Sequence, residues 1–309
     1  MKNYIWALTY ALVLLLFSSY VIFDTFISSQ IYTVVEDRQN EENEEHLQEE
    51  SEDTTSVVEE GGESISSEVS DLSYADENIS ITITEYREYD SSIYVADIRL
   101  SSANYLQTAF AQNAFGKNIT EKTSEIAENN NAILAINGDY YGTQENGFVV
   151  RNGVLYRTTA SRNQEDLVTY EDGSFEIITE KEADADALVA GGAQQILSFG
   201  PALVMDGVVS VTEDEEVGKA RASNPRTAIG IVDELHYMFV VSDGRTDESE
   251  GLSLYELAEF MESLGVSIAY NLDGGGSSTM YFNGEIINNP TTSGKIKERS
   301  VSDIVYIGY

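Results

Sequence analysis

The chain has 309 residues, of which 54 are acidic, 17 are basic, two are histidine and none is cysteine. A formal net charge of −37 argues against a nucleic-acid-binding protein, because such proteins carry a basic surface for phosphates. The lack of cysteine excludes disulfides, thiol nucleophiles and cysteine-ligated zinc or iron–sulfur sites. Any chemistry must therefore come mainly from carboxylates, arginines, hydroxyls and backbone amides.

The first 35 residues are predicted to be a membrane anchor. Nineteen uncharged residues run from Ile5 to Phe23. As a helix rising about 1.5 Å per residue, this run nearly spans a hydrocarbon core of about 30 Å. A cleavable signal peptide is the alternative, but the run exceeds a typical signal core and no A-x-A-like site follows it. We expect a single-pass anchor in the cell membrane, with the C-terminal domain outside the cytoplasm.

Residues 36–77 are predicted to be a disordered acidic linker. They include seventeen acidic residues and a single basic one, Arg38. Such a composition cannot bury enough apolar surface to offset the entropy lost on ordering, and charge repulsion should extend it.

Residues 78–309 are predicted to form one α+β domain with a mixed, largely antiparallel sheet and a few covering helices. Alternating apolar and polar residues over 79–86 and 91–100 indicate an opening pair of strands. Asn152-Gly153 and Asp172-Gly173 each separate two strand-like arms, which predicts two hairpins.

Two helices are expected in this domain. Ser253 and Glu256 fit a capping box at the start of an amphipathic helix that should end at Gly265. A second, short helix is expected over 121–129, ahead of a strand near Ile133.

The densest group of chemically useful residues follows an apolar strand near residue 270. Successive glycines permit positive φ and expose backbone amides, so an anion can approach the main chain closely. No Gly-Lys-Ser/Thr follows, which excludes a nucleotide P-loop. The residues alone leave two interpretations open, a functional loop and a plain glycine-rich turn capped by an aspartate. The group comprises Asn271, Asp273, Gly274, Gly275, Gly276, Ser277 and Ser278.

Four other stretches accompany this loop. They are Asn-Gly-Asp-Tyr-Tyr at 137–141, Phe-Gly-Pro-Ala-Leu-Val at 199–204, Asn-Pro-Arg at 224–226 leading to Ser-Asp-Gly-Arg at 242–245, and Glu-Arg-Ser-Val-Ser-Asp at 298–303. With the loop, these stretches resemble, in order, the motifs of the phosphodiester glycosidase family, which has bacterial relatives associated with exopolysaccharides. Asp139 and Ser300 depart from the family's usual pattern, but neither change removes a presumed catalytic group.

The resemblance implies a hydrolase that cleaves sugar-1-phosphodiester bonds of cell-wall or exopolysaccharide glycans. Arginine suits the phosphate because its planar fork binds two oxygens at once, and Arg226, Arg245 and Arg299 are the candidates. Ordinary arginine–carboxylate pairs are the alternative for each. A carboxylate should stabilise or trap the sugar cation, and the candidates are, in order of preference, Asp273, Asp243 and Asp139. Asp243 could instead only form a turn with the glycine after it.

Four further residues are candidates for the sugar. Asn137 and Asn271 could hydrogen-bond sugar hydroxyls or hold the loop, and Tyr140 and Tyr141 could stack on a sugar ring. No cofactor is required by this chemistry and no metal ligands are predicted. Carboxylates could bind Ca²⁺ or Mg²⁺, but no EF-hand spacing is present. The alternative function is a non-catalytic carbohydrate-binding or envelope polysaccharide assembly protein with the same fold.

Overall fold

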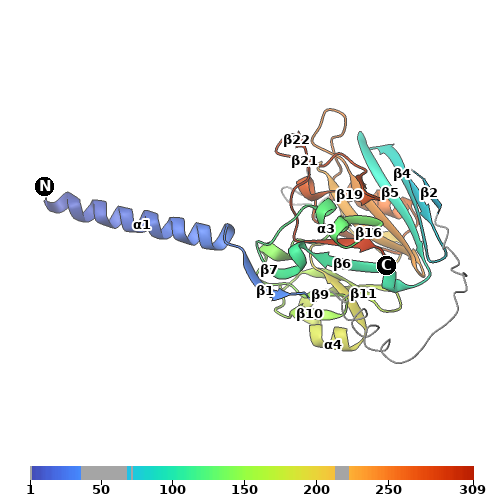
Figure 1. Ribbon diagram of the computed structural model, residues 1–309, viewed down its shortest axis with the longest axis horizontal. Helices are drawn as coiled ribbons and strands as arrows, with labels where there is room; N and C mark the ends of the chain where they lie inside the picture. The colour runs from blue at the N-terminus through green and yellow to red at the C-terminus, as the bar shows by residue number, and fades with distance from the viewer. Residues whose placement is uncertain (1, 36–67, 71, 213–222) are drawn as a thin grey trace, which may run out of the picture.

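The computed structural model describes residues 2–35, 68–70, 72–212 and 223–309 (Figure 1). Most of the predicted acidic linker, residues 36–67 and 71, lies outside the described residues. Helix α1 (Lys2–Phe26) extends away from the folded body, and strand β1 (Gln30–Val34) follows it at the edge of that body.

The largest sheet has nine strands, and every pairing in it is antiparallel. The predicted opening pair is confirmed as β4 and β5, where Ile79, Ile81 and Ile83 are buried and the residues between them are exposed. In spatial order the strands are β15 (Val208–Val209), β14 (Ala202–Met205), β18 (Ile268–Leu272), β16 (Arg226–Asp233), β17 (His236–Ser242), β5 (Ser91–Leu100), β4 (Ile79–Glu88), β3 (Ser73–Ala75) and β2 (Glu68–Ser70).

Two five-stranded antiparallel sheets complete the central framework. Both predicted hairpins are confirmed, and at the first of them Asn152 and Gly153 have φ of 50° and 77°. One sheet has the order β20 (Glu285–Ile286), β19 (Met280–Phe282), β8 (Leu134–Asn137), β23 (Asp303–Ile307), β6 (Leu106–Phe110). The other has the order β10 (Val154–Arg157), β9 (Val149–Arg151), β13 (Ala193–Leu197), β11 (Glu165–Tyr170), β12 (Phe175–Thr179).

Smaller elements lie around this framework. Strand β1 pairs with β7 (Ala114–Lys117), and β21 (Thr291–Thr292) pairs with β22 (Lys295–Ile296). The described residues of the folded body include the helices α3 (Thr123–Asn129), α4 (Ala185–Ala190) and α5 (Leu254–Ser263), with 3₁₀ turns η1 (Ala103–Tyr105), η2 (Ala111–Asn113), η3 (Tyr141–Thr143), η4 (Glu180–Glu182) and η6 (Gly275–Ser277). Both expected helices are confirmed, and the capping box of Ser253 and Glu256 starts α5.

One apolar core joins the three large sheets. It includes Ile98 and Phe239 from the nine-stranded sheet, Ile136 from the sheet of β8, and Leu167 from the sheet of β11. Helix α5 covers the other face of the nine-stranded sheet, and α3 covers the sheet of β8. Burying each large aliphatic side chain in this way contributes about 1.5–3 kcal/mol, so the sheets are held rigidly relative to one another.

The folded region begins earlier than predicted. Strands β2 and β3 lie in the segment predicted as linker, yet they pair with one another and β3 pairs with β4. Strand β1 lies in the segment predicted as anchor, yet it pairs with β7. The predicted transmembrane helix is not supported, because the described residues include no helix that is both long enough and apolar enough to cross a membrane.

Candidate functional site

The candidate site lies where the ends of strands from two sheets meet. In the nine-stranded sheet, the pairings of Arg226 with Ser242 and of Thr227 with Leu272 bring Arg226, Asp243 and Asp273 to the same end of three neighbouring strands. In the sheet of β8, Asn137 and Asp303 lie together at the ends of two paired strands, since Asn137 pairs with Ile304. The site is therefore assembled from strand ends that are far apart in the chain.

Asn137 connects the strand ends of the two sheets. Its Nδ2 donates to the carbonyl of Asp273 at 2.7 Å, and its Oδ1 accepts from Thr227 Oγ1 at 2.8 Å. Asn271 is also engaged with the main chain, because its Nδ2 donates to the Gly200 carbonyl at 2.7 Å. Both side chains are buried, as is Ser278. Of the two predicted roles for these asparagines, the structure supports holding the loop and does not support contact with a sugar.

Asp273 is held at the mouth of the loop by two groups predicted for the site. Its Oδ2 accepts from Arg299 Nη2 at 2.8 Å and from Ser277 Oγ at 2.6 Å. Arg299 Nε also donates to Ser277 Oγ at 2.8 Å, so the three side chains form a closed group. Burial raises the pKa of Asp273, and the Arg299 guanidinium opposes that rise.

The three glycines after Asp273 lie against the three predicted arginines. A Cβ on Gly275, where φ is 66°, would be 2.9 Å from Arg245 Nη2. A Cβ on Gly276 would be 3.5 Å from Arg299 Cβ, and one on Gly274 would be 3.9 Å from Arg226 Cδ. A side chain at position 275 would therefore crowd Arg245, whereas the other two distances are ordinary van der Waals contacts. Arg245 and Arg299 lie beside the turn, and Arg299 Nη2 donates to the Gly274 carbonyl at 3.1 Å. The Arg226 side chain is engaged elsewhere, because its Nε donates to the Leu252 carbonyl at 2.8 Å.

Asp243 is tied to the same loop through residues that the sequence analysis missed. Its Oδ1 accepts from Asn289 N at 2.8 Å and from Asn288 Nδ2 at 3.1 Å. Asn288 Nδ2 also donates to the carbonyl of Ser278 at 3.0 Å. The Asn288-Asn289-Pro290 sequence resembles any turn, and its contact with Asp243 depends on tertiary structure alone.

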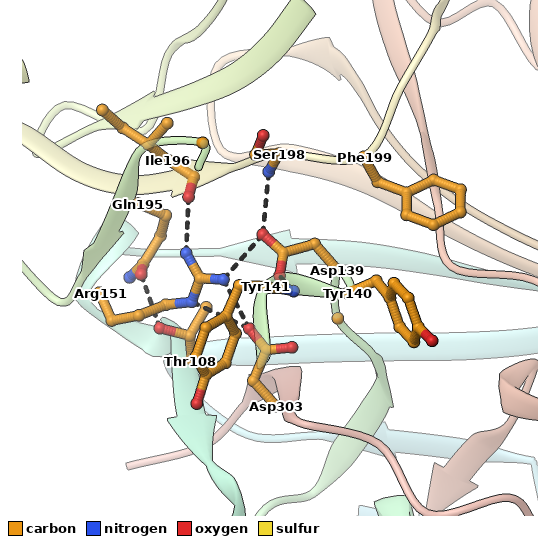
Figure 2. Close-up of polar contacts among 12 residues, drawn as sticks. Thr108, Asp139, Tyr140, Tyr141, Arg151, Gln195, Ile196, Ser198, Phe199 and Asp303 are labelled. Atoms are coloured by element: carbon orange, nitrogen blue, oxygen red, sulfur yellow. Dashed lines mark hydrogen bonds and ion pairs between the residues drawn. The ribbon is translucent and has the colours of Figure 1, made fainter. Parts of the chain in front are cut away.

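Asp139, the third predicted catalytic aspartate, belongs to a buried ionic network with Arg151 and Asp303 (Figure 2). Its Oδ2 accepts from Arg151 Nη2 at 2.9 Å and from Ser198 N at 2.8 Å, and its Oδ1 accepts from Tyr141 N at 2.9 Å. The residue is only 1% exposed. With both oxygens engaged and buried, Asp139 positions neighbouring groups, and the structure does not support a catalytic role for it.

Asp303 shares Arg151 with Asp139 and was assigned no role from the sequence. Its Oδ2 accepts from Arg151 Nη2 at 2.6 Å and from Arg151 Nε at 2.9 Å. Burial and the neighbouring Asp139 carboxylate raise the pKa of Asp303, while Arg151 opposes the rise. Asp303 lies within a recognised stretch, 298–303, but its link to residues 139 and 151 could not be seen in the sequence.

The two adjacent tyrosines have different environments. Tyr140 is 43% exposed, and its ring points away from Arg151 (Figure 2), so it remains a candidate for stacking on a sugar. Tyr141 is 1% exposed and its ring packs against Phe115 and Phe110. The prediction that Tyr141 is a sugar platform is therefore wrong, because a core residue cannot meet a ligand.

No group of three His, Cys, Asp or Glu side chains among the described residues could hold a metal ion.

Comparison with known proteins places this site in context. A family model described as phosphodiester glycosidase matches residues 130–308. The SPbeta prophage-derived uncharacterized protein YomE of Bacillus subtilis is 31% identical over 202 residues, which cover 63% of this chain and 31% of that protein. N-acetylglucosamine-1-phosphodiester alpha-N-acetylglucosaminidase of Mus musculus is 37% identical over 87 residues, which cover 27% of this chain and 17% of that protein.

A solved structure shares the fold. It is the catalytic domain of zebrafish N-acetylglucosamine-1-phosphodiester alpha-N-acetylglucosaminidase, auto-inhibited by its pro-peptide, and it matches with a TM-score of 0.61 at 20% identity. The match covers 75% of this chain and 83% of that one. The chain spans less than a third of the length of the two curated relatives, 31% and 17%.

Proposed function

Since the chain belongs to the phosphodiester glycosidase family, we propose that it hydrolyses the bond between the anomeric carbon of a sugar and a phosphodiester group. The observation that carries this proposal is the position of Asp273, Arg245 and Arg299 around the glycine-rich turn at 274–276. A domain that only formed a turn there would not need to bring two guanidinium groups to it. The proposed substrates are glycans of the cell wall or exopolysaccharide.

The geometry suggests how the work is divided. Arg245 and Arg299 would bind the phosphate. As the bond from the anomeric carbon to the phosphate oxygen breaks, its electron pair leaves with the phosphate. The ionised Asp273 carboxylate would stabilise the sugar cation or bond to it before water supplies a hydroxyl group. Phosphate leaves without full protonation, so the step does not require a dedicated general acid. The proton from water passes to solvent.

Turnover of a defined substrate tests the proposal. The protein is incubated with an N-acetylglucosamine-1-phosphodiester, and free sugar is measured for the unmodified chain and for Asp273→Asn. Loss of the carboxylate charge should lower kcat by about 10²–10⁴-fold. Asp247→Asn, at an exposed acid two residues after Arg245, is the matched control and should retain full activity. Undiminished turnover by Asp273→Asn would refute the assignment, and sugar binding without turnover by any form would favour the non-catalytic alternative.

The proposal extends to location. The protein would act outside the cytoplasm, held at the cell membrane by α1. The support is that α1 carries apolar side chains with no cover, among them Leu8, Leu15 and Phe17, which are 70%, 64% and 63% exposed. Exposed apolar surface on this scale is unfavourable in water and favourable in a lipid interface.

A further inference from the structure

Three basic side chains beside the candidate site have no acidic partner among the residues that the structure describes. Residues 78–309 contain 36 acidic and 15 basic residues, so the domain as a whole is acidic. Yet in the described part of the chain no carboxylate lies within ion-pair distance of Arg245, Lys295 or Lys297. All three residues are exposed. We call these three residues the basic rim.

The rim is attached to the glycine-rich turn. Lys295 belongs to the β21–β22 hairpin and Lys297 follows it directly (Figure 1). Thr292 Oγ1, before the hairpin's turn, donates to the Gly276 carbonyl at 3.3 Å, and Arg299 N, after it, donates to the same carbonyl at 3.1 Å. Both ends of the hairpin are thus bonded to the turn, so the lysines are held close to the candidate site.

The positive charge of the hairpin is not diluted by its own acid. Glu298 is the one acidic residue between positions 290 and 299. Its Oε1 accepts from Ser124 N at 3.0 Å and its Oε2 accepts from Ser124 Oγ at 2.7 Å, at the start of α3. Since Glu298 bonds to another element, Lys295 and Lys297 present their charges without a compensating carboxylate from the same segment.

We propose that the basic rim is a subsite for additional anionic groups, and that the substrate is a polyanionic glycan with repeated phosphates. This inference rests on the proposed function. One phosphodiester needs only the groups around 274–276, and it would leave Lys295 and Lys297 unused. Lysine binds phosphate as a flexible point charge, which suits the mobile neighbouring units of a polymer. A chain of net charge −37 otherwise repels polyanions, so local cations are required to admit one.

Two substrates of the same sugar separate the subsite from the reaction. The full chain is assayed on the methyl diester of N-acetylglucosamine-1-phosphate and on poly(N-acetylglucosamine-1-phosphate). The polymer should have the higher kcat/KM per hydrolysable linkage. In the double variant Lys295→Gln, Lys297→Gln, the ratio of kcat/KM for polymer over diester should fall about three- to tenfold, as expected for two exposed charges. The control Arg162→Gln, Lys181→Gln removes two exposed positive charges from segments that flank β11 and β12 and should leave the ratio unchanged.

Each outcome decides the inference. Hydrolysis of the diester with no preference for the polymer, or a preference that the double variant retains, would overturn the subsite and leave the proposed function intact. If neither substrate is hydrolysed, the proposed function fails. The subsite is then tested by calorimetry, which compares the affinity of the protein for tripolyphosphate with its affinity for inorganic phosphate. Tighter binding of tripolyphosphate that the double variant loses supports it, and equal binding of the two probes contradicts it.

Discussion

At the scale of single residues, buried carboxylates in this protein differ by what surrounds them. Asp139 and Asp303 share Arg151, whereas Asp166 lies buried beside Glu180 and no hydrogen-bond partner among the described residues reaches its oxygens. Burial, with the Glu180 carboxylate next, raises the pKa of Asp166 to about 10. Asp166 is therefore expected to be a neutral acid at physiological pH.

This raised pKa has a predictable effect on stability. A carboxyl whose folded pKa exceeds its unfolded value stabilises the fold most at acidic pH, below the unfolded pKa, and that contribution is lost as pH rises toward the folded value. Asp166→Asn has no carboxyl to ionise, so the variant does not lose this stability as pH rises. Its free energy of unfolding should therefore exceed that of the unmodified chain by about 1–3 kcal/mol at pH 8. Urea denaturation at pH 8 and pH 5 measures this, with a smaller gain expected at pH 5. Equal or lower stability of the variant at both pH values would contradict the prediction.

At the scale of elements, η6 shows why a glycine is needed at one position. Gly275 combines φ of 66° with Arg245 Nη2 at 2.9 Å from the site of a Cβ. Gly275→Ala should therefore cost about 1 kcal/mol of stability through its backbone conformation and should also displace Arg245. The matched control is Gly284→Ala, where φ is 94° and no atom lies within 4 Å of the Cβ site.

Kinetics separates these two effects. If Arg245 binds phosphate, KM for a sugar-1-phosphodiester should rise about tenfold in Gly275→Ala, through lost contacts to a charged group, and remain unchanged in Gly284→Ala. A similar KM in both variants would show that the position of Arg245 does not matter for the substrate.

At the scale of the whole molecule, α1 and the folded body have opposite surfaces. The helix exposes apolar side chains, and the body carries a large excess of acid. The full chain is expected to sediment with membranes, whereas a chain lacking residues 2–26 should be found in the supernatant. A deletion that leaves the distribution unchanged would remove the support for attachment through α1.

Much of the fold follows from local patterns, which explains why it could be predicted. The hairpins at Asn152-Gly153 and Asp172-Gly173 need only turn residues between apolar arms, and α5 needs only its capping box and apolar stripe. The pattern was less informative before residue 78, where β2 and β3 pair with the domain despite an acidic, polar composition. Edge strands of this kind depend on an existing sheet for their partner, so a short window of sequence cannot reveal them.

The candidate site divides in the same way. Asp273, Gly274, Gly275 and Gly276 are contiguous, so the chain itself places the carboxylate beside the amides, and motif resemblance connects Arg226, Arg245 and Arg299 to them. Tyr141 was misassigned because the chain turns at η3, sending one tyrosine outward and its neighbour into an aromatic cluster. The roles of three other residues could not be predicted from the sequence: Asp303, Arg151 and Asn288. Strand pairing across more than a hundred residues, for example, places Asp303 beside Asn137. Residues that are adjacent in the chain can be recognised as a site from the sequence. The burial of a side chain and its hydrogen-bond or ion-pair partners depend on which strand ends meet in the fold.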